Sequence, residues 1–349
     1  GAVEAFRVVE RAIAGGPIPG AAAAVDDQTA CFGATESPER TEGAPGTRPA
    51  VSADTWYDLA SLTKVLCTVP LLLGRIAEGR LDPAAPLREL LPEVAWMQPS
   101  PSLADARLIE LVTHTSGLPA WEPLYTLGLD RATLLARVLQ TPLGDTHGQV
   151  LYSDLGYIVL GHLLERHGGA PLDESAAALY GRLGLGDQLA FRPGVDRGRC
   201  APTERCPWRG RLLRGEVHDE NAAAMGGVSG HAGLFGTLRG VVGFARALLE
   251  GRLFSEPVVA YLAREQARGP DGERRGFGWM LAHPGWSGGD LAGPRTVGHT
   301  GFTGTGLWID LDRGRRTVLL TNRVHPSRHV DSGIDGLRRA FNHAAFAAP

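Results

Sequence analysis

Apolar residues recur with a strand-like period near both ends of the chain and with a helical period between them. At the two ends, the pattern predicts a helix over 2–14, strands over 20–25, 29–33 and near Trp56, strands over 296–299, 305–311 and 317–322, and an amphipathic helix over 333–346. Between them it predicts helices over 104–112, 131–139, 155–167, 172–183, 239–249 and 256–266. We therefore expect a sheet assembled from the two ends of the chain, with a helical insertion packed beside it.

Ser61 and Lys64 stand three residues apart in an apolar stretch between Leu59 and Val69. If a helix begins near Ser61, the hydroxyl and the amine share one face, one turn apart. A serine hydroxyl becomes a nucleophile when a base takes its proton, and a lysine serves as that base when burial or positive charge lowers its pKa. Lys64 is the only lysine among the 35 lysine and arginine residues, so arginine fills every position where charge alone suffices. The pattern favours a catalytic pair over the alternative, an exposed helix start with a solvated lysine.

A second candidate motif, Tyr152-Ser153-Asp154, directly precedes a predicted helix. A tyrosine beside a serine and a lysine can relay a proton, because the ammonium group favours the phenolate. The alternative is that Ser153 or Asp154 caps the helix while Tyr152 only packs.

A third candidate is a glycine-rich strand end, VGHTGFTGTG at residues 297–306. Backbone N–H groups at such a strand edge can bind a developing oxyanion, and a glycine lets a substrate lie close to the main chain. The alternative is a glycine-rich hairpin with an incidental His299.

Further polar residues gather in the second half of the chain, namely Glu204, His218, Asp219, Asn221 and His231. They line the mouth of a site or hold loops by hydrogen bonds, and the sequence leaves both interpretations open. A metal site from His218 and Asp219 is a less supported third option.

The segment GWSGG at 285–289 matches the nucleophile-elbow pattern of another hydrolase fold, but Pro284 precedes it and glycines follow, so a loop is predicted there.

The composition narrows the classes of partner. With 349 residues, 43% of them hydrophobic, the chain can bury a large core, and a net charge of −3 with a pI near 6.4 gives no basic surface for nucleic acid. No apolar run reaches the length of a bilayer span and no signal peptide is recognisable, so we expect a soluble protein, cytoplasmic or exported. Cys31 and Cys67 are expected to be buried thiols, and Cys200 and Cys206 either close a small disulfide or remain free.

The three motifs, SLTK at 61–64, YSD at 152–154 and HTG at 299–301, stand in an order that resembles the serine hydrolases of the penicillin-binding protein and class C β-lactamase superfamily, in its esterase and D-peptidase branch. Four more segments are similar to that family: LVTHTSGLP at 111–119, VHDENA at 217–222, GHAGLFGT at 230–237 and LLTNR at 319–323. The resemblance covers nearly the whole chain.

The resemblance implies an α/β fold of the α+β type, like that of β-lactamases and transpeptidases. Its central antiparallel sheet, built from both chain ends and flanked by helices, would form one domain from residues 1–64 and 292–349. Residues 65–291 would form a mainly helical domain, with the active site between the two.

Carried over by position, the resemblance implies that Ser61 is the acylated nucleophile, Lys64 its base or proton relay, and Tyr152 a partner in acid–base work. The backbone N–H groups of Ser61 and Phe302 would form the oxyanion hole. The residues expected to bind substrate are His299, Thr300, Gly301 and Asp154, and a possible site rim consists of His218, Asp219, Asn221 and His231. No metal and no cofactor is expected.

Two departures from the β-lactamases of this branch narrow the expected activity. Those enzymes usually carry Lys where this chain has His299 and Asn where it has Asp154. With histidine at that position, the chain is similar to certain D-Ala-D-Ala carboxypeptidases and D-aminopeptidases. The negative charge of Asp154 weakens the inference to peptide-like substrates and leaves simple esters as candidates.

We therefore expect a serine hydrolase that cleaves a small-molecule ester, amide or peptide, of the carboxylesterase or D-amino-acid peptidase type. An acyltransferase using the same site, or a weakly catalytic penicillin- or peptidoglycan-binding module, are the alternatives, and a true β-lactamase is disfavoured. The sequence leaves the oligomeric state open.

Overall fold

The computed structural model describes residues 1–38, 48–96 and 102–347 of the chain. Its centre is an antiparallel eight-stranded sheet with the strand order β2-β1-β13-β12-β11-β10-β9-β8. The strands are β1 (Gly20–Val25), β2 (Gln28–Gly33), β8 (Ala267–Arg268), β9 (Arg274–Arg275), β10 (Met280–Leu281), β11 (Thr296–Gly301), β12 (Thr305–Asp310) and β13 (Arg315–Thr321). Because β1 pairs with β13, the two ends of the chain meet within one sheet, which confirms the expected α/β fold.

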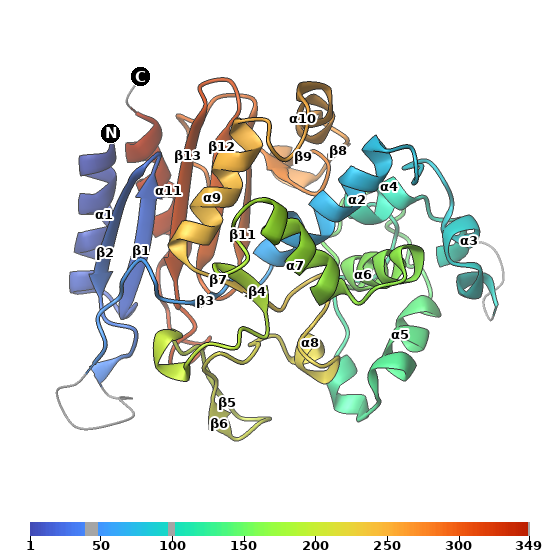
Figure 1. Ribbon diagram of the computed structural model, residues 1–349, viewed down its shortest axis with the longest axis horizontal. Coiled ribbons are helices and arrows are strands. Elements are labelled where there is room, and N and C mark those ends of the chain that lie inside the picture. Colours follow the sequence, from blue (N-terminus) through green and yellow to red (C-terminus); the bar gives the residue numbers. More distant parts are fainter. Residues whose placement is uncertain (39–47, 97–101, 348–349) are drawn as a thin grey trace.

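Helices cover both faces of this sheet (Figure 1). α1 (Ala2–Gly15) and α11 (Ile334–Phe346) pack together on one face, whereas α9 (Leu238–Leu249) contacts β1 and β13 from the other. The inner strand β1 is therefore buried on both faces, and its four consecutive alanines allow the helices to approach closely.

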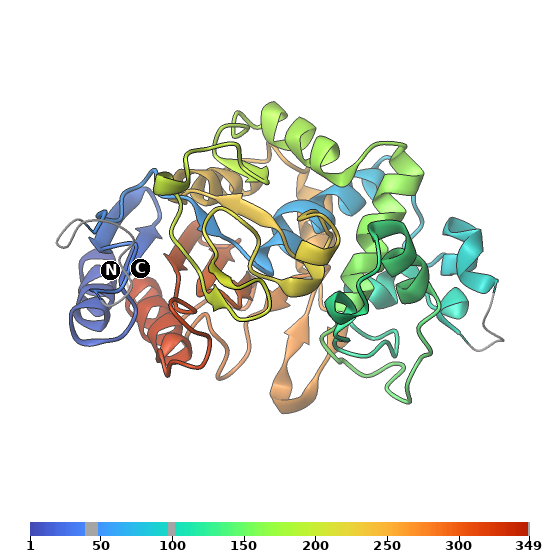
Figure 2. The ribbon, with the colours of Figure 1, turned by 90° about the horizontal axis from the view of Figure 1, so that it is seen from below.

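A mainly helical region lies beside the sheet, on the side away from both termini (Figures 1 and 2). The remaining α-helices are α2 (Val69–Ala77), α3 (Leu87–Leu90), α4 (Leu108–Val112), α5 (Arg131–Leu139), α6 (Asp154–Gly168), α7 (Leu172–Arg182), α8 (Glu220–Ala224) and α10 (Glu256–Ala263). Short 3₁₀ turns occur at Pro92–Ala95, Leu103–Asp105, Leu124–Leu127, Arg197–Arg199 and Pro270–Gly272. Two small sheets complete the fold, one of β3 (Tyr57–Asp58), β7 (Leu234–Gly236) and β4 (Leu189–Phe191), the other of β5 (Arg205–Cys206) and β6 (Arg211–Leu212).

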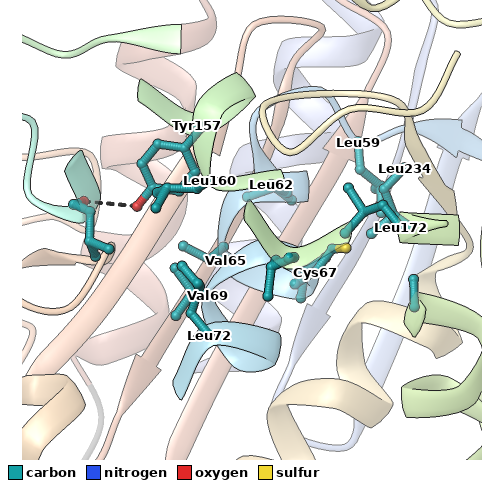
Figure 3. Close-up of a cluster of buried hydrophobic side chains, with 14 of the residues drawn as sticks. Leu59, Leu62, Val65, Cys67, Val69, Leu72, Tyr157, Leu160, Leu172 and Leu234 are labelled. Carbon is teal, nitrogen blue, oxygen red and sulfur yellow. Dashed lines mark hydrogen bonds between the residues drawn. The ribbon is translucent and has the colours of Figure 1, made fainter. Parts of the chain in front are cut away.

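One apolar core joins the sheet to the helical region, and the segment that follows Ser61 lies within it (Figure 3). Leu62, Val65 and Val69 are buried in the same cluster as Tyr157 of α6 and Leu234 of β7. The segment that carries the proposed nucleophile is therefore held by side chains from both parts of the molecule, which limits its motion.

Some elements differ from the sequence-based expectation. The sheet extends beyond β11 through β8–β10, which come from the region 65–291 that was assigned to a mainly helical domain. The helix predicted over 256–266 ends at Ala263. Ser61 lies in a turn, and the helix after it begins as a π-helical turn, Lys64–Thr68, before α2 continues. The division into two domains stays a prediction, with β8–β10 now assigned to the sheet.

The cysteines are all free thiols. Cys200 and Cys206 are buried without a disulfide, so the disulfide alternative is wrong, and Cys67 is buried as expected. Cys31 is exposed, contrary to expectation, because it lies on the outward face of the edge strand β2.

Among the helices in the described ranges, none combines the length and the apolar character that crossing a membrane requires.

Candidate active site

Ser61 sits in a tight turn that is fixed by hydrogen bonds on both sides. Ala60 has a positive φ of 49°, which is uncommon for a residue with a side chain. Its N–H donates to the Asp58 carboxylate at 2.8 Å, and its carbonyl oxygen accepts from the Thr63 hydroxyl at 2.6 Å. These bonds keep the backbone at Ser61 in one conformation.

The end of β11 is held against the Ser61 turn. The Thr303 hydroxyl donates to the Asp58 carbonyl at 2.7 Å, and the Thr305 hydroxyl donates to the Leu59 carbonyl at 3.1 Å. A Cβ at Gly301 would lie only 2.6 Å from the Leu59 carbonyl oxygen, so the close approach requires glycine. Within the described residues, the backbone N–H groups of Ser61 and Phe302 have no hydrogen-bond partner. Both are thus available to a ligand.

Lys64 is fully buried, and its ammonium group makes three hydrogen bonds. Nζ donates to the Ser61 hydroxyl oxygen at 2.9 Å, to Asp154 Oδ1 at 2.8 Å and to the His231 carbonyl at 3.3 Å. It also lies 4.7 Å from the centre of the Tyr152 ring. The expected pair of Ser61 and Lys64 is therefore in direct contact, and Asp154 faces Lys64.

The pKa of Lys64 differs from the sequence-based expectation. Burial alone would lower this pKa, but the charge of Asp154, together with Tyr152 and the hydrogen bonds that Lys64 donates to both, raises it above the usual value. At neutral pH the resting amine is therefore protonated and donates to Ser61. The resting state therefore does not meet the condition of a lowered pKa, and the role of Lys64 as base or proton relay stays a prediction.

The motif at Tyr152 is positioned by the start of α6. The Ser153 hydroxyl accepts from the Gly156 N–H at 3.3 Å, so it caps the helix as one interpretation proposed. The Ser153 N–H donates to His114 Nδ1 at 2.9 Å, and the His114 ring lies 4.5 Å from that of Tyr152. Burial and the charges of Arg275 and Lys64 hold the pKa of His114 well below its usual value, so His114 is neutral. Sequence reasoning assigned His114 no role, although it lies within LVTHTSGLP.

A cavity of about 390 Å³ opens beside Ser61. It is lined by Ser61, Tyr152, Arg275, Met280, Ser287, His299, Thr300 and Phe302. Four of the expected substrate-binding or oxyanion residues thus reach one cavity, whereas Asp154 does not line it and Gly301 lies behind it, against Leu59. Ser287 belongs to the GWSGG loop and accepts a hydrogen bond from Trp308 Nε1 at 3.0 Å, as a structural loop residue would.

His299 is a neutral histidine at the cavity wall. Burial and the charges of Lys64 and Arg275 lower its pKa to about 3. Its Nδ1–H donates to the Thr300 carbonyl at 2.8 Å, and its buried Nε2 has no hydrogen-bond partner within the described ranges. The free nitrogen is therefore an acceptor for a substrate N–H or O–H.

Arg275 was not predicted as a site residue, yet it is buried in the cavity wall. Its guanidinium carbon lies 5.4 Å from the centre of the Tyr152 ring, and its Nη2 pairs with Glu273 at 2.6 Å. Its Nη1 is buried without a partner among the described residues. A strand of two residues is too short to show a periodicity, so no sequence signal marked Arg275.

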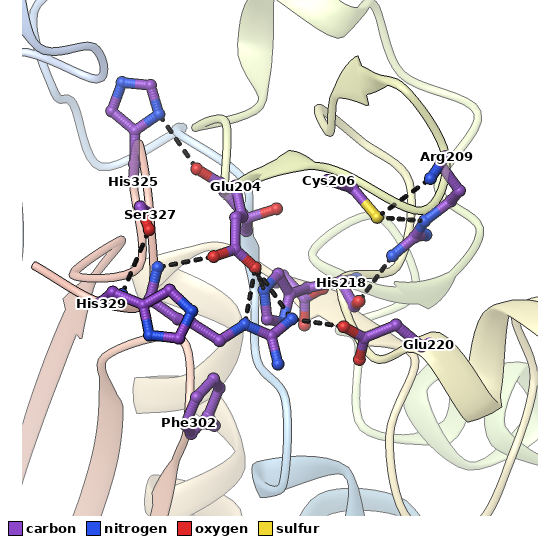
Figure 4. Close-up of polar contacts among 12 residues, drawn as sticks. Glu204, Cys206, Arg209, His218, Glu220, Phe302, His325, Ser327 and His329 are labelled. Carbon is purple, nitrogen blue, oxygen red and sulfur yellow. Dashed lines mark hydrogen bonds and ion pairs between the residues drawn. The ribbon is translucent and has the colours of Figure 1, made fainter. Parts of the chain in front are cut away.

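The rim residues mainly hold loops. The Asn221 side chain accepts from the Tyr125 N–H at 3.1 Å and donates to the Glu122 carbonyl at 2.8 Å. His218 Nε2 contacts Glu204 at 3.0 Å, and its ring stacks at 5.9 Å on that of Phe302, which is 49% exposed (Figure 4). Of the two interpretations, the contacts favour loop-fixing hydrogen bonds for Asn221 and support of the Phe302 ring for His218.

His231 belongs to a buried polar chain behind Lys64. Its Nδ1 contacts the Ser229 hydroxyl and its Nε2 contacts Asp219, both at 2.8 Å. Ser229 is buried, so this Ser-His-Asp arrangement does not present a nucleophile to a substrate. Asp154, Asp219 and His231 place potential metal-ligand atoms within 4.8 Å of one another. The Asp154 carboxylate, however, already forms an ion pair with the Lys64 ammonium.

The chain belongs to the Beta-lactamase family, because it matches the Beta-lactamase family model over residues 6–340. A Salmonella agona (strain SL483) protein named as a D-alanyl-D-alanine carboxypeptidase is 33% identical over 314 residues, which cover 78% of this chain and 71% of that protein. These findings confirm the resemblance inferred from the three motifs.

Solved structures agree on the fold. Simvastatin synthase LovD from Aspergillus terreus matches with a TM-score of 0.76 at 20% identity, covering 99% of this chain and 98% of that one. EstCE1, described as a hydrolase with promiscuous acyltransferase activity, matches with a TM-score of 0.77 at 19% identity, covering 98% of each chain. At these identities the likeness concerns the fold alone.

Proposed function

We propose that this protein is a serine hydrolase that forms an acyl-enzyme at Ser61 and cleaves an ester or an amide. The observation that carries the proposal is the contact of the Ser61 hydroxyl with the buried Lys64 ammonium at 2.9 Å, at the wall of a cavity. The backbone N–H groups of Ser61 and Phe302 have no partner among the residues that the structure describes. The turn at Ser61 and the end of β11 are held together by hydrogen bonds, and the two N–H groups suit a developing oxyanion.

The proton transfers follow from the charges of the cluster. Tyr152, beside the Lys64 ammonium, relays the proton of the Ser61 hydroxyl as the oxygen attacks the substrate carbonyl. Tyr152 then returns that proton to the leaving alcohol or amine. In the second half of the reaction, water attacks the acyl carbonyl, gives its proton to Tyr152 and releases the acid with Ser61 restored.

Asp154 keeps Lys64 in the charged, ammonium form that the proposed mechanism uses. The sequence interpretation placed its charge beside a substrate amide, which weakened the case for peptides. Its carboxylate instead lies 2.8 Å from Lys64 Nζ, and it keeps the amine protonated. The objection to amide and peptide substrates therefore loses its basis.

Arg275 favours a substrate that carries a carboxylate near the scissile bond. A buried guanidinium whose Nη1 has no partner in the described part of the chain gains most from an anionic partner, and Thr300 at the same cavity offers a hydroxyl. This preference agrees with the carboxypeptidase name of the Salmonella relatives. We therefore favour short peptides or esters with a free carboxylate as the substrate class.

Acyl transfer to an alcohol or amine is the second candidate, since it uses the same residues with another acceptor in place of water. The structural neighbours LovD, a synthase, and EstCE1, a hydrolase with acyltransferase activity, give this candidate its support. Product analysis with and without an added alcohol distinguishes it from hydrolysis, because only a transferase forms the new ester at the expense of the acid.

The experiment that tests the proposal is intact-mass detection of acylation by a fluorophosphonate, a p-nitrophenyl ester and a penicillin. We expect the fluorophosphonate adduct and a transient ester-derived acyl group on the wild type, and neither on Ser61→Ala. Equal labelling of Ser61→Ala would refute the mechanism. A stable adduct without turnover of any ester or peptide would instead identify a binding module.

The substrate class is tested with matched peptides that end in a carboxylate or an amide. In wild type the carboxylate peptide should have the higher kcat/KM, and Arg275→Gln should reduce that preference. An unchanged ratio would show that Arg275 does not read the carboxylate.

A further inference from the structure

The two N–H groups assigned to the oxyanion hole belong to peptide groups whose carbonyl oxygens are both hydrogen-bonded twice. The Phe302 N–H shares its peptide with the Gly301 carbonyl. That oxygen accepts from Arg338 Nη2 at 2.8 Å and from the Gly304 N–H at 2.9 Å. The arrangement places a positive charge directly on the peptide that presents the oxyanion donor.

The second donor has a similar arrangement. The Ser61 N–H shares its peptide with the Ala60 carbonyl, which accepts from the Thr63 hydroxyl at 2.6 Å and from the Thr63 N–H at 3.0 Å. Thr63 is fully buried, and its hydroxyl oxygen accepts the Leu234 N–H at 3.1 Å, which fixes the direction of its own proton toward Ala60.

Arg338 is well suited to act on a peptide dipole. It extends from α11, is only 6% exposed and also donates to the Thr305 carbonyl at 3.0 Å. Its carboxylate neighbour, Asp335, lies 3.3 Å away with a side chain that is 95% exposed, so solvent screens that pair. Burial lowers the pKa of Arg338 to about 10, which still leaves it charged at neutral pH.

A hydrogen bond to an amide oxygen increases the polarity of the whole peptide group, and its N–H becomes a stronger donor. We propose that Arg338 and Thr63 are positioning residues that strengthen the two oxyanion donors through the carbonyls of the same peptides. Neither side chain touches the substrate. The inference rests on the proposed acyl-enzyme at Ser61.

The size of the effect follows from two known magnitudes. Loss of one oxyanion donor costs about 10²–10³-fold in rate. If each polarising bond supplies about 10–30% of a donor's strength, its loss slows acylation by about 1.5- to 8-fold. The charged Arg338 belongs at the upper end of this range.

The test is the infrared carbonyl band of the acyl group, isolated as the difference between ¹³C- and ¹²C-labelled acyl-enzymes. A stronger oxyanion hole polarises this carbonyl and lowers its frequency. We expect the band to move to higher wavenumber in Arg338→Gln and in Thr63→Val, with slower acylation and a nearly unchanged KM for the ester. Thr63→Ser, which keeps the hydroxyl, should restore the wild-type band.

The matched control is Arg323→Gln. Arg323 Nε donates at 2.8 Å to the Phe302 carbonyl, which belongs to the next peptide, and its guanidinium lies 4.3 Å from the centre of the Phe302 ring. This variant disturbs the same residue without acting on the peptide of the Phe302 N–H. Its acyl band should stay at the wild-type position.

Each outcome decides the inference. Unshifted bands in folded Arg338→Gln and Thr63→Val would overturn it, and so would an equal shift in Arg323→Gln, which would indicate simple misplacement of Phe302. If Arg338→Gln does not fold, the Thr63 pair decides alone. If the wild type forms no acyl-enzyme at Ser61, the proposed function itself fails, and this inference fails with it.

Discussion

Glu204 is the centre of a buried ionic cluster beside the Phe302 ring (Figure 4). Its replacement by glutamine tests how much this cluster stabilises the protein. Its carboxylate accepts from Arg328 Nε at 2.9 Å and from the Arg328 N–H at 2.6 Å, and it contacts His218 Nε2 at 3.0 Å. Glu204→Gln keeps the shape of the side chain but removes the charge that these donors share. The Arg328 side chain retains one partner, Glu220.

The expected loss of stability in Glu204→Gln follows from the pKa of Glu204. Burial acts to raise this pKa, but the hydrogen bonds from His218 and Arg328 lower it from 4.5 to about 2. A difference of this size corresponds to about 3 kcal/mol in the free energy of unfolding at neutral pH. Because the unfolded state binds the proton more tightly, this contribution is complete above pH 4.5 and is lost as the pH falls toward 2.

The assay is urea unfolding of wild type and Glu204→Gln, followed by tryptophan fluorescence at pH 7, 4.5 and 3.5. We expect Glu204→Gln to be less stable by about 3 kcal/mol at pH 7 and the difference to shrink at pH 3.5. The control is Glu250→Gln, whose exposed pair with Arg252 is worth less than about 1 kcal/mol. A stability difference that stays constant with pH would refute the reasoning, because an ionised carboxylate would then not be its source.

The other predictions concern the catalytic cluster. Lys64→Arg should lose nearly all acylation in a p-nitrophenyl ester burst, because a planar guanidinium does not reproduce the 2.9 Å contact of the buried ammonium group with the Ser61 hydroxyl; a wild-type burst would contradict this. Asp154→Asn removes the charge that raises the pKa of Lys64, so the basic limb of the acylation pH profile, where the Lys64 ammonium loses its proton, should move to lower pH; an unmoved basic limb would show that it does not report Lys64. Gly301→Ala adds a Cβ that meets the Thr305 hydroxyl oxygen and lies 2.6 Å from the Leu59 carbonyl oxygen, and we expect a loss of about 1–3 kcal/mol in thermal unfolding together with slower acylation. Wild-type values of both would show that β11 adjusts without moving Phe302.

The sequence predicted the parts of the structure that have strong local patterns. The strands β1 and β11–β13 have six or seven residues each, enough for the sequence to indicate them, and the SLTK, YSD and HTG motifs pointed to residues that meet around Ser61. In contrast, β8–β10 have two residues each, too few for any pattern, and Arg275 was missed with them.

Roles that depend on side-chain direction were beyond the sequence. Asp154 begins α6, and whether a carboxylate at that position faces the substrate or Lys64 depends on how α6 packs. The pKa of Lys64 has the same origin, since burial and a carboxylate act on it in opposite directions and only their geometry decides the sign. The double hydrogen bonds on the oxyanion peptides join residues as far apart as Gly301 and Arg338, which no local motif connects.

The burial of the one lysine has a practical consequence. Since Lys64 has no exposed surface, the folded protein offers no lysine side chain to amine-directed reagents, so cross-linking or immobilisation through lysine will fail on the native state. Modification of Lys64 requires the core around Ser61 to open. The rate at which an acylating dye reaches this amine therefore measures how often the centre of the molecule opens, as hydrogen exchange does for a buried amide.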